Sequence, residues 1–399
     1  MRKKVRHVLG ISGGKDSAAL GLYMSEHFPE IELDFYSCDT GRELDETYEL
    51  IDNLEAYLGI EVTKLHAVDT DKMTKPNFDE SEELSPFDYL LKDYGGFLPS
   101  TYSRWCTKDL KLKPFEEYIG DDPTISYVGI RGDEDREAYV STKENVQTIF
   151  PFKKNIWSFD VLDLVLDYHN TGQLKDIYER IVKPEKLARI LEEVERPISI
   201  EHNFNKKVDA LINLNVTAFN RAVFHFLKKT DFPLSQLEES DFPLLDKSHI
   251  EKEQQRVVVR ETVFEMLEES IGVPEYYKKM EYEVDGKKGT YSRTRSGCFF
   301  CFYQQKIEWI WLYENNREKF EAAKKYEKEG FTWIENESLD ELTQPERIKD
   351  IKLKHIEKKQ TKNGKTSKTL LNNLLGEEEK GDYFDKEDED YAGCTVCFI

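Results

Sequence analysis

The sequence predicts an α/β protein in which helices cover a parallel sheet and a helical subdomain is inserted. Two observations support this fold class. Short apolar runs alternate with helix-like segments over residues 5–70, and the first apolar run ends in a Gly-rich turn that opens a helix. Parallel strands need a crossover connection, which is usually helical, so this alternation favours a parallel sheet. A chain of 399 residues has room for one large domain or two ordinary ones.

The expected elements follow in order along the chain. The apolar runs predict strands at residues 5–11, 31–38, 61–68 and 125–130, with helices at 17–27 and 45–58 between the first three. A long loop at 70–105 is rich in Pro, Gly, Ser and acidic residues, and such loops are often functional. A 3.6-residue period then predicts helices at 186–194, 207–227, 251–270 and 307–329.

These elements divide the chain into four predicted parts. They are a nucleotide-binding α/β domain (1–160), a helical insertion (161–270), a cysteine-containing part (271–350) and a charged, mobile tail that ends in Cys-x-x-Cys (351–399). The tail is expected to be mobile because its apolar content is low. Seven lysines and one glutamate lie within 352–368, and nine acidic residues lie within 377–390. Such charge blocks are usually solvated, although partner docking or autoinhibition of a basic groove remain alternatives.

Charge and hydropathy exclude some functions. The net charge is −22, whereas a protein that grips nucleic acid alone usually shows a basic face. We therefore expect any DNA to be held through partner subunits. No apolar run approaches the length of a membrane span, so no membrane association is expected. The basic start, residues 1–4, runs directly into the Gly-rich turn and does not resemble a signal peptide, which favours a cytoplasmic location.

The Gly-rich turn at residues 10–17, Gly-Ile-Ser-Gly-Gly-Lys-Asp-Ser, has the features of a phosphate cradle. Glycines let backbone N–H groups approach an anion, and the helix N-terminus adds partial positive charge. Ser12, Lys15 and Ser17 add side-chain donors. The turn is not a Walker loop, because that pattern needs Ser or Thr directly after the lysine, where Asp16 stands.

This octet resembles the PP-loop of ATP pyrophosphatases, in which the loop grips the pyrophosphate that leaves when ATP is split into AMP and pyrophosphate. The resemblance implies an adenine nucleotide alpha hydrolase-like (HUP) fold and an ATP site with Mg²⁺. It also implies that Lys15 and Asp16 act in catalysis. The residues that it assigns to nucleotide binding within the loop are Ser12, Gly13, Gly14, Lys15, Asp16 and Ser17.

A second signature, Asp-Thr-Gly-Arg-Glu-Leu-Asp-Glu-Thr, starts at Asp39, directly after the second expected strand. Ligands in open α/β sheets bind beyond the carboxyl ends of the strands, so Asp39 and Thr40 are candidates to contact the nucleotide or its Mg²⁺. An ordinary strand-turn-helix, capped by Asp45, is the alternative. Beside the PP-loop, the element is similar to one found in the phosphoadenosine phosphosulfate (PAPS) reductase family.

Two further stretches support that resemblance. The first, at 103–114, contains Arg-Trp-Cys-Thr, and the second, Gly-Ile-Arg-Gly-Asp-Glu-Asp-Arg, runs from Gly129 to Arg136 after a strand. Arg131 and Arg136 are candidates to grip phosphate or sulfate-like oxygens, with Arg131 also acting in catalysis and Gly129 lining the nucleotide. Salt bridges to nearby acids are the alternative for both arginines. Lys108 and Lys111 are weaker candidates, since they also suit an exposed helix surface.

Cysteines form the third group of candidates. Cys298 and Cys301 form a Cys-x-x-Cys pair among aromatic residues, and the resemblance implies that Cys106 joins them to hold a metal centre. A 4Fe–4S cluster is the first expectation, with Zn²⁺ or buried free thiols as alternatives. Adenylyl sulfate reductases carry a tandem cysteine where Trp105 stands here. Cys394 or Cys397 would supply a fourth ligand or relay sulfur, or else belong to a free, oxidisable chain end.

The complete set of motifs resembles the DndC- and SspD-type proteins of bacterial DNA phosphorothioation. Loops of PAPS reductases depart from the full Ser-Gly-Gly-Lys-Asp-Ser pattern, which is intact here. We therefore expect ATP cleavage to AMP and pyrophosphate that activates an oxygen for sulfur insertion. A cysteine desulfurase and other modification-complex subunits are the implied partners. The alternatives are tRNA thiolation, a PAPS-type reductase, and a non-catalytic nucleotide-sensing subunit of a defence complex.

Overall fold

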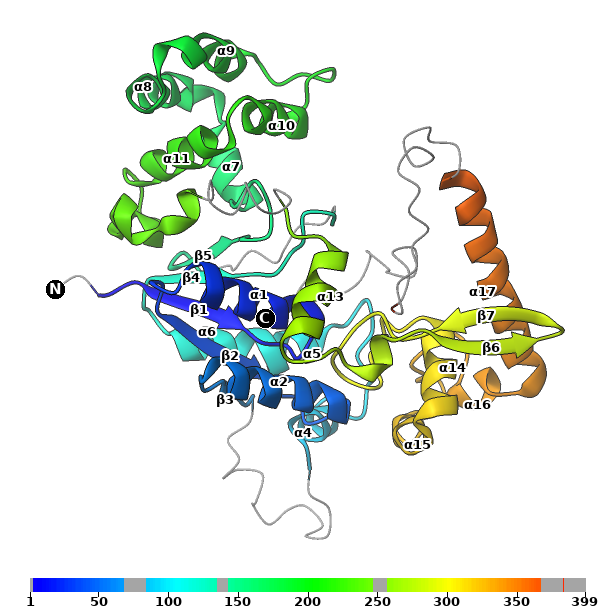
Figure 1. Ribbon diagram of the computed structural model, residues 1–399. Helices are drawn as coiled ribbons and strands as arrows, with labels where there is room; N and C mark the ends of the chain where they lie inside the picture. Colours follow the sequence, from blue (N-terminus) through cyan, green and yellow to red (C-terminus); the bar gives the residue numbers. More distant parts are fainter. Residues whose placement is uncertain (1–2, 68–83, 135–142, 247–256, 367–382, 384–399) are drawn as a thin grey trace.

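A five-stranded parallel sheet forms the centre of the protein in the computed structural model, as Figure 1 shows. The structure describes residues 3–67, 84–134, 143–246 and 257–366, together with Tyr383. The strand order is β3-β2-β1-β4-β5, and every neighbouring pair is parallel. The strands are β1 (Arg6–Gly10), β2 (Leu33–Cys38), β3 (Thr63–Leu65), β4 (Thr124–Tyr127) and β5 (Val146–Ile149). The predicted α/β class is therefore confirmed.

Helices cover the sheet because their apolar residues pack against the buried strands. Val8 and Leu9 in β1 and Leu20 in the first helix are almost completely buried. β1 is the central strand, and its apolar run is therefore enclosed on both faces. The covering helices are α1 (Lys15–His27), α2 (Asp45–Leu58) and α6 (Lys113–Ile119), with a π-helical turn η1 (Lys108–Leu112) before α6. Helices α4 (Pro86–Asp93) and α5 (Trp105–Thr107) pack instead with residues from the C-terminal part of the chain.

A group of helices follows β5 and stands above the sheet in Figure 1. Its members are α7 (Phe159–Val165), α8 (Thr171–Ile181), α9 (Pro184–Glu195), α10 (Phe204–Leu214) and α11 (Val216–Leu227), with short 3-10 turns η2 (Tyr168–Asn170), η3 (Pro233–Gln236), η4 (Glu239–Asp241) and η5 (Pro243–Leu245). The single helix expected at 207–227 is broken at Asn215, because the Asn215 side chain accepts a bond from the Ala218 N–H and caps α11.

The next helix, α13 (Arg260–Glu269), packs against α1 and so lies beside the sheet. The sequence placed this segment within the helical insertion, and its periodicity could not show which surface it covers. The 3-10 turn η6 (Glu275–Tyr277) and an antiparallel hairpin, β6 (Met280–Val284) and β7 (Lys287–Tyr291), follow it. The remaining helices are α14 (Lys306–Asn315), α15 (Arg317–Lys324), α16 (Leu339–Leu342) and α17 (Pro345–Thr366).

Helix α17 differs from the expectation of a mobile tail from residue 351. It runs to Thr366 and packs along the β6–β7 hairpin, as Figure 1 shows. Ile351 and Ile356 are buried beneath it, and the Lys352 ammonium contacts the Glu314 carboxylate at 2.7 Å. Buried apolar residues and ion pairs together therefore anchor a segment of low overall hydropathy. None of the described helices combines the length and apolarity that a membrane crossing requires.

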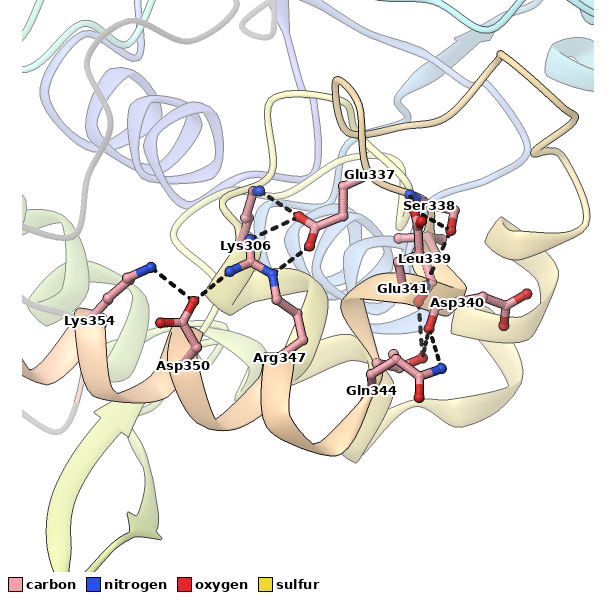
Figure 2. Close-up of polar contacts among 11 residues, drawn as sticks. Lys306, Glu337, Ser338, Leu339, Asp340, Glu341, Gln344, Arg347, Asp350 and Lys354 are labelled. Carbon is pink, nitrogen blue, oxygen red and sulfur yellow. Dashed lines mark hydrogen bonds and ion pairs between the residues drawn. The ribbon is translucent and has the colours of Figure 1, made fainter.

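An ion-pair network fastens the start of α17 to α14 (Figure 2). The Glu337 carboxylate accepts bonds from Lys306 and from Arg347, each at 2.5 Å. Arg347 also contacts Asp350 at 2.5 Å, and Lys354 contacts Asp350 at 2.9 Å. The network borders a cavity of about 620 Å³. Hydrogen bonds from Arg347, supported by Lys306, hold the pKa of Glu337 below its ordinary value of 4.5.

Glu337→Gln is expected to lower the unfolding temperature at pH 7 by about 2 °C, because it removes the charge from a mostly buried carboxylate that pairs with two partly exposed cations. A carboxyl whose pKa is lower in the folded chain stabilises it above its unfolded pKa, and this stabilisation is lost as the pH falls through the folded pKa. The difference between wild type and variant should therefore shrink below about pH 4.5. Thermal unfolding at several pH values tests this, with Glu335→Gln, an exposed neighbour, as the control.

Candidate functional site

The candidate site lies where the strand order reverses. Strand β1 has β2 on one side and β4 on the other, so the loops that follow these three strands meet at one edge of the sheet. They carry residues 11–14, 39–44 and 128–134. Ligands of open α/β sheets bind in the crevice at such a switch point. Three of the predicted motifs therefore come together at the expected place.

The phosphate loop is closed by bonds among its own serines. The Ser17 hydroxyl contacts the Ser12 hydroxyl and the Ser12 N–H, both at 3.2 Å, and donates to the Gly14 carbonyl at 3.1 Å. Gly13 has a φ of +69°, and a Cβ there would lie 2.3 Å from the Thr47 methyl carbon. Only glycine suits this position, for both conformational and packing reasons. The loop therefore wraps tightly around the N-terminus of α1.

Behind the loop lies a buried cluster of charges. The Lys15 ammonium contacts one oxygen of Asp16 at 3.1 Å, and the Arg131 guanidinium contacts the other at 2.8 Å. Arg131 is completely buried, and it also contacts Asp133 at 3.0 Å and Glu134 at 3.1 Å. In this arrangement Arg131 fixes the orientation of Asp16, as the salt-bridge alternative anticipated. Direct contact between Arg131 and a nucleotide stays a prediction, and Arg136 lies outside the described residues.

Gly129 has a packing role that the sequence did not reveal. A Cβ on Gly129 would lie 2.7 Å from the backbone carbonyl oxygen of Asp16. Any larger residue would push the loop after β4 away from the first turn of α1. The glycine therefore lets the Arg131 and Asp16 side chains approach each other. Its predicted contact with the nucleotide stays a prediction.

The loop after β2 presents a hydrogen-bonded set of acidic groups. Asp39 accepts bonds from the Gly41 N–H at 2.7 Å and the Tyr48 hydroxyl at 2.9 Å. The Thr40 hydroxyl donates to Glu43 at 2.7 Å. Burial, reinforced by the nearby Asp39 charge, raises the pKa of the Glu43 carboxyl. Asp39 and Thr40 thus lie at the crevice as expected, and Glu43 is a buried member of the site that the sequence analysis did not identify.

A segment from the C-terminal part of the chain completes the site. Cys298 forms an isolated antiparallel bridge with Glu43, and the Phe299 N–H donates to the Arg42 carbonyl at 3.0 Å. Ser296 lies against the phosphate loop, because a Cβ on Gly14 would be 2.5 Å from its hydroxyl oxygen. The site is therefore built by residues nearly 300 positions apart.

Tyr277 is a second contribution from this part of the chain. Its hydroxyl accepts a bond from the Lys15 N–H at 3.3 Å, and the Lys15 ammonium lies 5.5 Å from the centre of its ring. Burial raises the pKa of Tyr277 to about 12, so the group remains a neutral phenol. Nothing in the local sequence distinguishes Tyr277 from the adjacent Tyr276, which is also buried. Only the packing of α13 and η6 against α1 reveals its role.

Two of the described cysteines, Cys106 and Cys298, lie in one aromatic cluster beside the site. Cys106 and Cys298 pack against the same aromatic cluster, in which Trp105 stacks on Phe87. The Cys298 thiol lies 3.2 Å from the Thr40 hydroxyl, and burial raises the pKa of this thiol. No group of three or more His, Cys, Asp or Glu side chains suited to a metal ion occurs within the described ranges. The assignment of Cys106, Cys298 and Cys301 to one metal centre therefore stays a prediction.

Other cysteine predictions have separate outcomes. Cys394 and Cys397, the expected fourth ligand or sulfur relay, lie outside the described residues. Cys38, at the end of β2, is buried in the core, and burial raises the pKa of its thiol to about 12. The iron–sulfur cluster and the Zn²⁺ alternative stay predictions, and no chemical step below depends on them.

The fold and the site define an α/β protein of the nucleotide-binding kind, with its phosphate loop after the central strand. The chain belongs to the phosphoadenosine phosphosulfate reductase domain family, whose model matches residues 6–243. A segment of 166 residues is 26% identical to an uncharacterized protein of Methanocaldococcus jannaschii, covering 38% of this chain and 30% of that protein. No solved structure matches the chain at a comparable level of significance.

The family match confirms the expected membership in the phosphoadenosine phosphosulfate reductase family. The match assigns residues 6–243 to a phosphoadenosine phosphosulfate reductase domain. The match extends through α7–α11 to residue 243, whereas the motif resemblance covers about residues 5–160 and 263–335. It does not include Tyr277, Ser296 or Cys298, which contact the loops of the matched region. The DndC- and SspD-type specificity stays a prediction.

Proposed function

We propose that the protein is an ATP pyrophosphatase, which cleaves ATP to AMP and pyrophosphate and so activates an oxygen for replacement by sulfur. The observation that carries this proposal is the intact Ser-Gly-Gly-Lys-Asp-Ser loop at the carboxyl end of β1, at the point where strand order reverses. Three fused phosphates carry more charge than one sulfate ester and need more donors. The loop offers backbone N–H groups, two serine hydroxyls and one lysine.

The proposed reaction has two displacements. An acceptor oxygen attacks the α-phosphorus, the bond between the α-phosphorus and the bridging oxygen breaks, and pyrophosphate leaves with that oxygen. Hydrosulfide then attacks the adenylylated centre of the acceptor and expels AMP, so that sulfur replaces oxygen without any change of oxidation state. Lys15 and the loop N–H groups stabilise the charge that develops on the leaving pyrophosphate. The ion pair with Arg131 holds the Asp16 carboxylate in a fixed orientation beside the phosphate loop.

Mg²⁺ would neutralise part of the phosphate charge when bound. Carboxylate oxygens are the ligands that Mg²⁺ prefers, and Asp39 presents one at the crevice. Asp16 offers a second carboxylate, although both of its oxygens already contact cationic side chains. The donor types at the site therefore fit the ion, and Asp39 is the residue that we assign to it.

For the acceptor we propose a DNA backbone phosphate, modified in a complex with a cysteine desulfurase and subunits that hold the DNA. The motif resemblance and the net charge of −22 support this choice. Thiolation of tRNA uses the same chemistry and is the second candidate. A nucleotide-sensing subunit would bind ATP without releasing pyrophosphate.

The test uses the purified full-length protein with ATP and Mg²⁺. We expect pyrophosphate and AMP to appear in equal amounts, with stimulation by the acceptor. Mass spectrometry of cellular DNA and tRNA, with and without the gene, should then show sulfur lost from DNA. Release of orthophosphate and ADP, or no nucleotide turnover with any acceptor, would contradict the pyrophosphatase assignment. Loss of sulfur from tRNA alone would contradict the DNA assignment.

A further inference from the structure

We propose that Arg295 and Ser296 bind the β- and γ-phosphates of the nucleotide from the side opposite the phosphate loop. This inference rests on the proposed function and adds to it the residues that recognise the triphosphate. Both lie beyond residue 243, where the family match ends. The site is therefore completed by a part of the chain outside the matched residues.

Ser296 is placed directly at the loop. Its hydroxyl oxygen would be 2.5 Å from a Cβ on Gly14, so it lies within reach of whatever the loop N–H groups bind. Residue 14 must be glycine for this approach to occur. The Tyr277 hydroxyl, which contacts the Lys15 N–H, lies on the same side. Serine and tyrosine hydroxyls thus face a loop whose own donors suit an anion.

Arg295 is the adjacent residue and carries a charge that no described carboxylate neutralises. It is half-buried, and no ion pair of its guanidinium is found in the described part of the chain. Arg131, in contrast, has three carboxylates around it. Consecutive Cα atoms are about 3.8 Å apart. Arg295 directly precedes Ser296, whose hydroxyl lies at the loop, and we assign its guanidinium to the phosphates because it can bind two oxygens at once.

The backbone that carries this pair is held firmly. The buried Arg293 guanidinium donates to the carbonyls of Cys298 and Phe299, both at 3.4 Å. The buried Glu308 carboxylate accepts from the Thr294 N–H at 2.8 Å and from its hydroxyl at 2.9 Å. Gly297 allows the turn with a φ of +100°. Residues on both sides of Arg295 and Ser296 are thus fixed. A preorganised protein segment loses little conformational entropy when a nucleotide binds to it.

The test compares nucleotide affinities by calorimetry on the full chain. We expect Arg295→Ala to weaken binding of a non-hydrolysable ATP analogue about tenfold or more, because a bidentate charged contact is lost. Binding of AMP, which has no β- or γ-phosphate, should change less than twofold. Arg295→Lys should recover part of the lost affinity, since it restores the positive charge but not the planar guanidinium that donates to two oxygens. Ser296→Ala should weaken ATP-analogue binding less than Arg295→Ala.

Arg189→Ala, on the exposed side of α9, is the matched control and should bind as wild type does. Thermal unfolding of each variant shows whether the fold is retained. Equal ATP-analogue affinity in Arg295→Ala and wild type would overturn this inference and leave the proposed function intact. An equal loss for AMP and the ATP analogue would also overturn it, because the contact would not be to the β- and γ-phosphates. Failure of the wild type to bind ATP would overturn both.

Discussion

Lys15→Ala is expected to reduce pyrophosphate release by about 100- to 1,000-fold, the loss that follows removal of one preorganised donor to a developing anion. Lys15 is the cation of the phosphate loop, and its ammonium is buried beside Asp16. Asp16 keeps its bond to Arg131 in the variant, so the local fold should persist. Release of pyrophosphate from ATP, measured at saturating nucleotide, reports the effect on the chemical step.

The control is Lys186→Ala, which removes an exposed lysine from α9 and should leave turnover unchanged. Circular dichroism and thermal unfolding establish that both variants are folded. If Lys15→Ala released pyrophosphate at the wild-type rate, the phosphate loop would not be the catalytic element, and the ATP pyrophosphatase assignment would fail.

Arg131→Ala should produce the largest loss of stability, about 3–5 kcal/mol in the free energy of unfolding. The substitution removes a completely buried guanidinium and leaves Asp16, Asp133 and Glu134 without their shared counter-charge. Buried carboxylates that lose a shared counter-charge are costly because the protein interior solvates them poorly. Urea unfolding measures the free energy directly, and pyrophosphate release should fall as well because Asp16 loses its orientation.

Arg131→Lys is the conservative comparison and should recover part of the stability, because a single ammonium can contact only some of the three carboxylates. Arg189→Ala, which removes an exposed arginine, should change the free energy of unfolding by less than about 0.5 kcal/mol. A loss below about 1 kcal/mol in Arg131→Ala would show that the charge cluster does not support the loop.

The sequence was sufficient to predict the sheet and the position of its phosphate loop. Alternating apolar runs placed β1, β2 and β4 within a few residues, and the Gly-rich octet marked the start of α1. These signals are local, since they depend on side-chain period and turn chemistry. Strand β5 and the β6–β7 hairpin were not predicted, although Asp285-Gly286 is a typical hairpin turn.

The role of each charged residue could not be predicted in the same way. Arg131 was expected to grip an anion, but three acidic side chains surround it in the fold. Tyr277 and Ser296 reach the loop only because distant elements pack against α1 and α2, which no sequence period records. Arginine in a motif predicts that an anion lies nearby. Whether that anion is a phosphate or a carboxylate depends on tertiary contacts.

The position of β1 in the centre of the sheet has a consequence for biosynthesis. Leu9 pairs with Phe35 on one side but with Tyr127 on the other. During translation, one edge of β1 therefore lacks its partner until β4 has left the ribosome. Exposed edges of apolar strands promote aggregation of nascent chains. Chaperone capacity should accordingly increase the yield of folded protein.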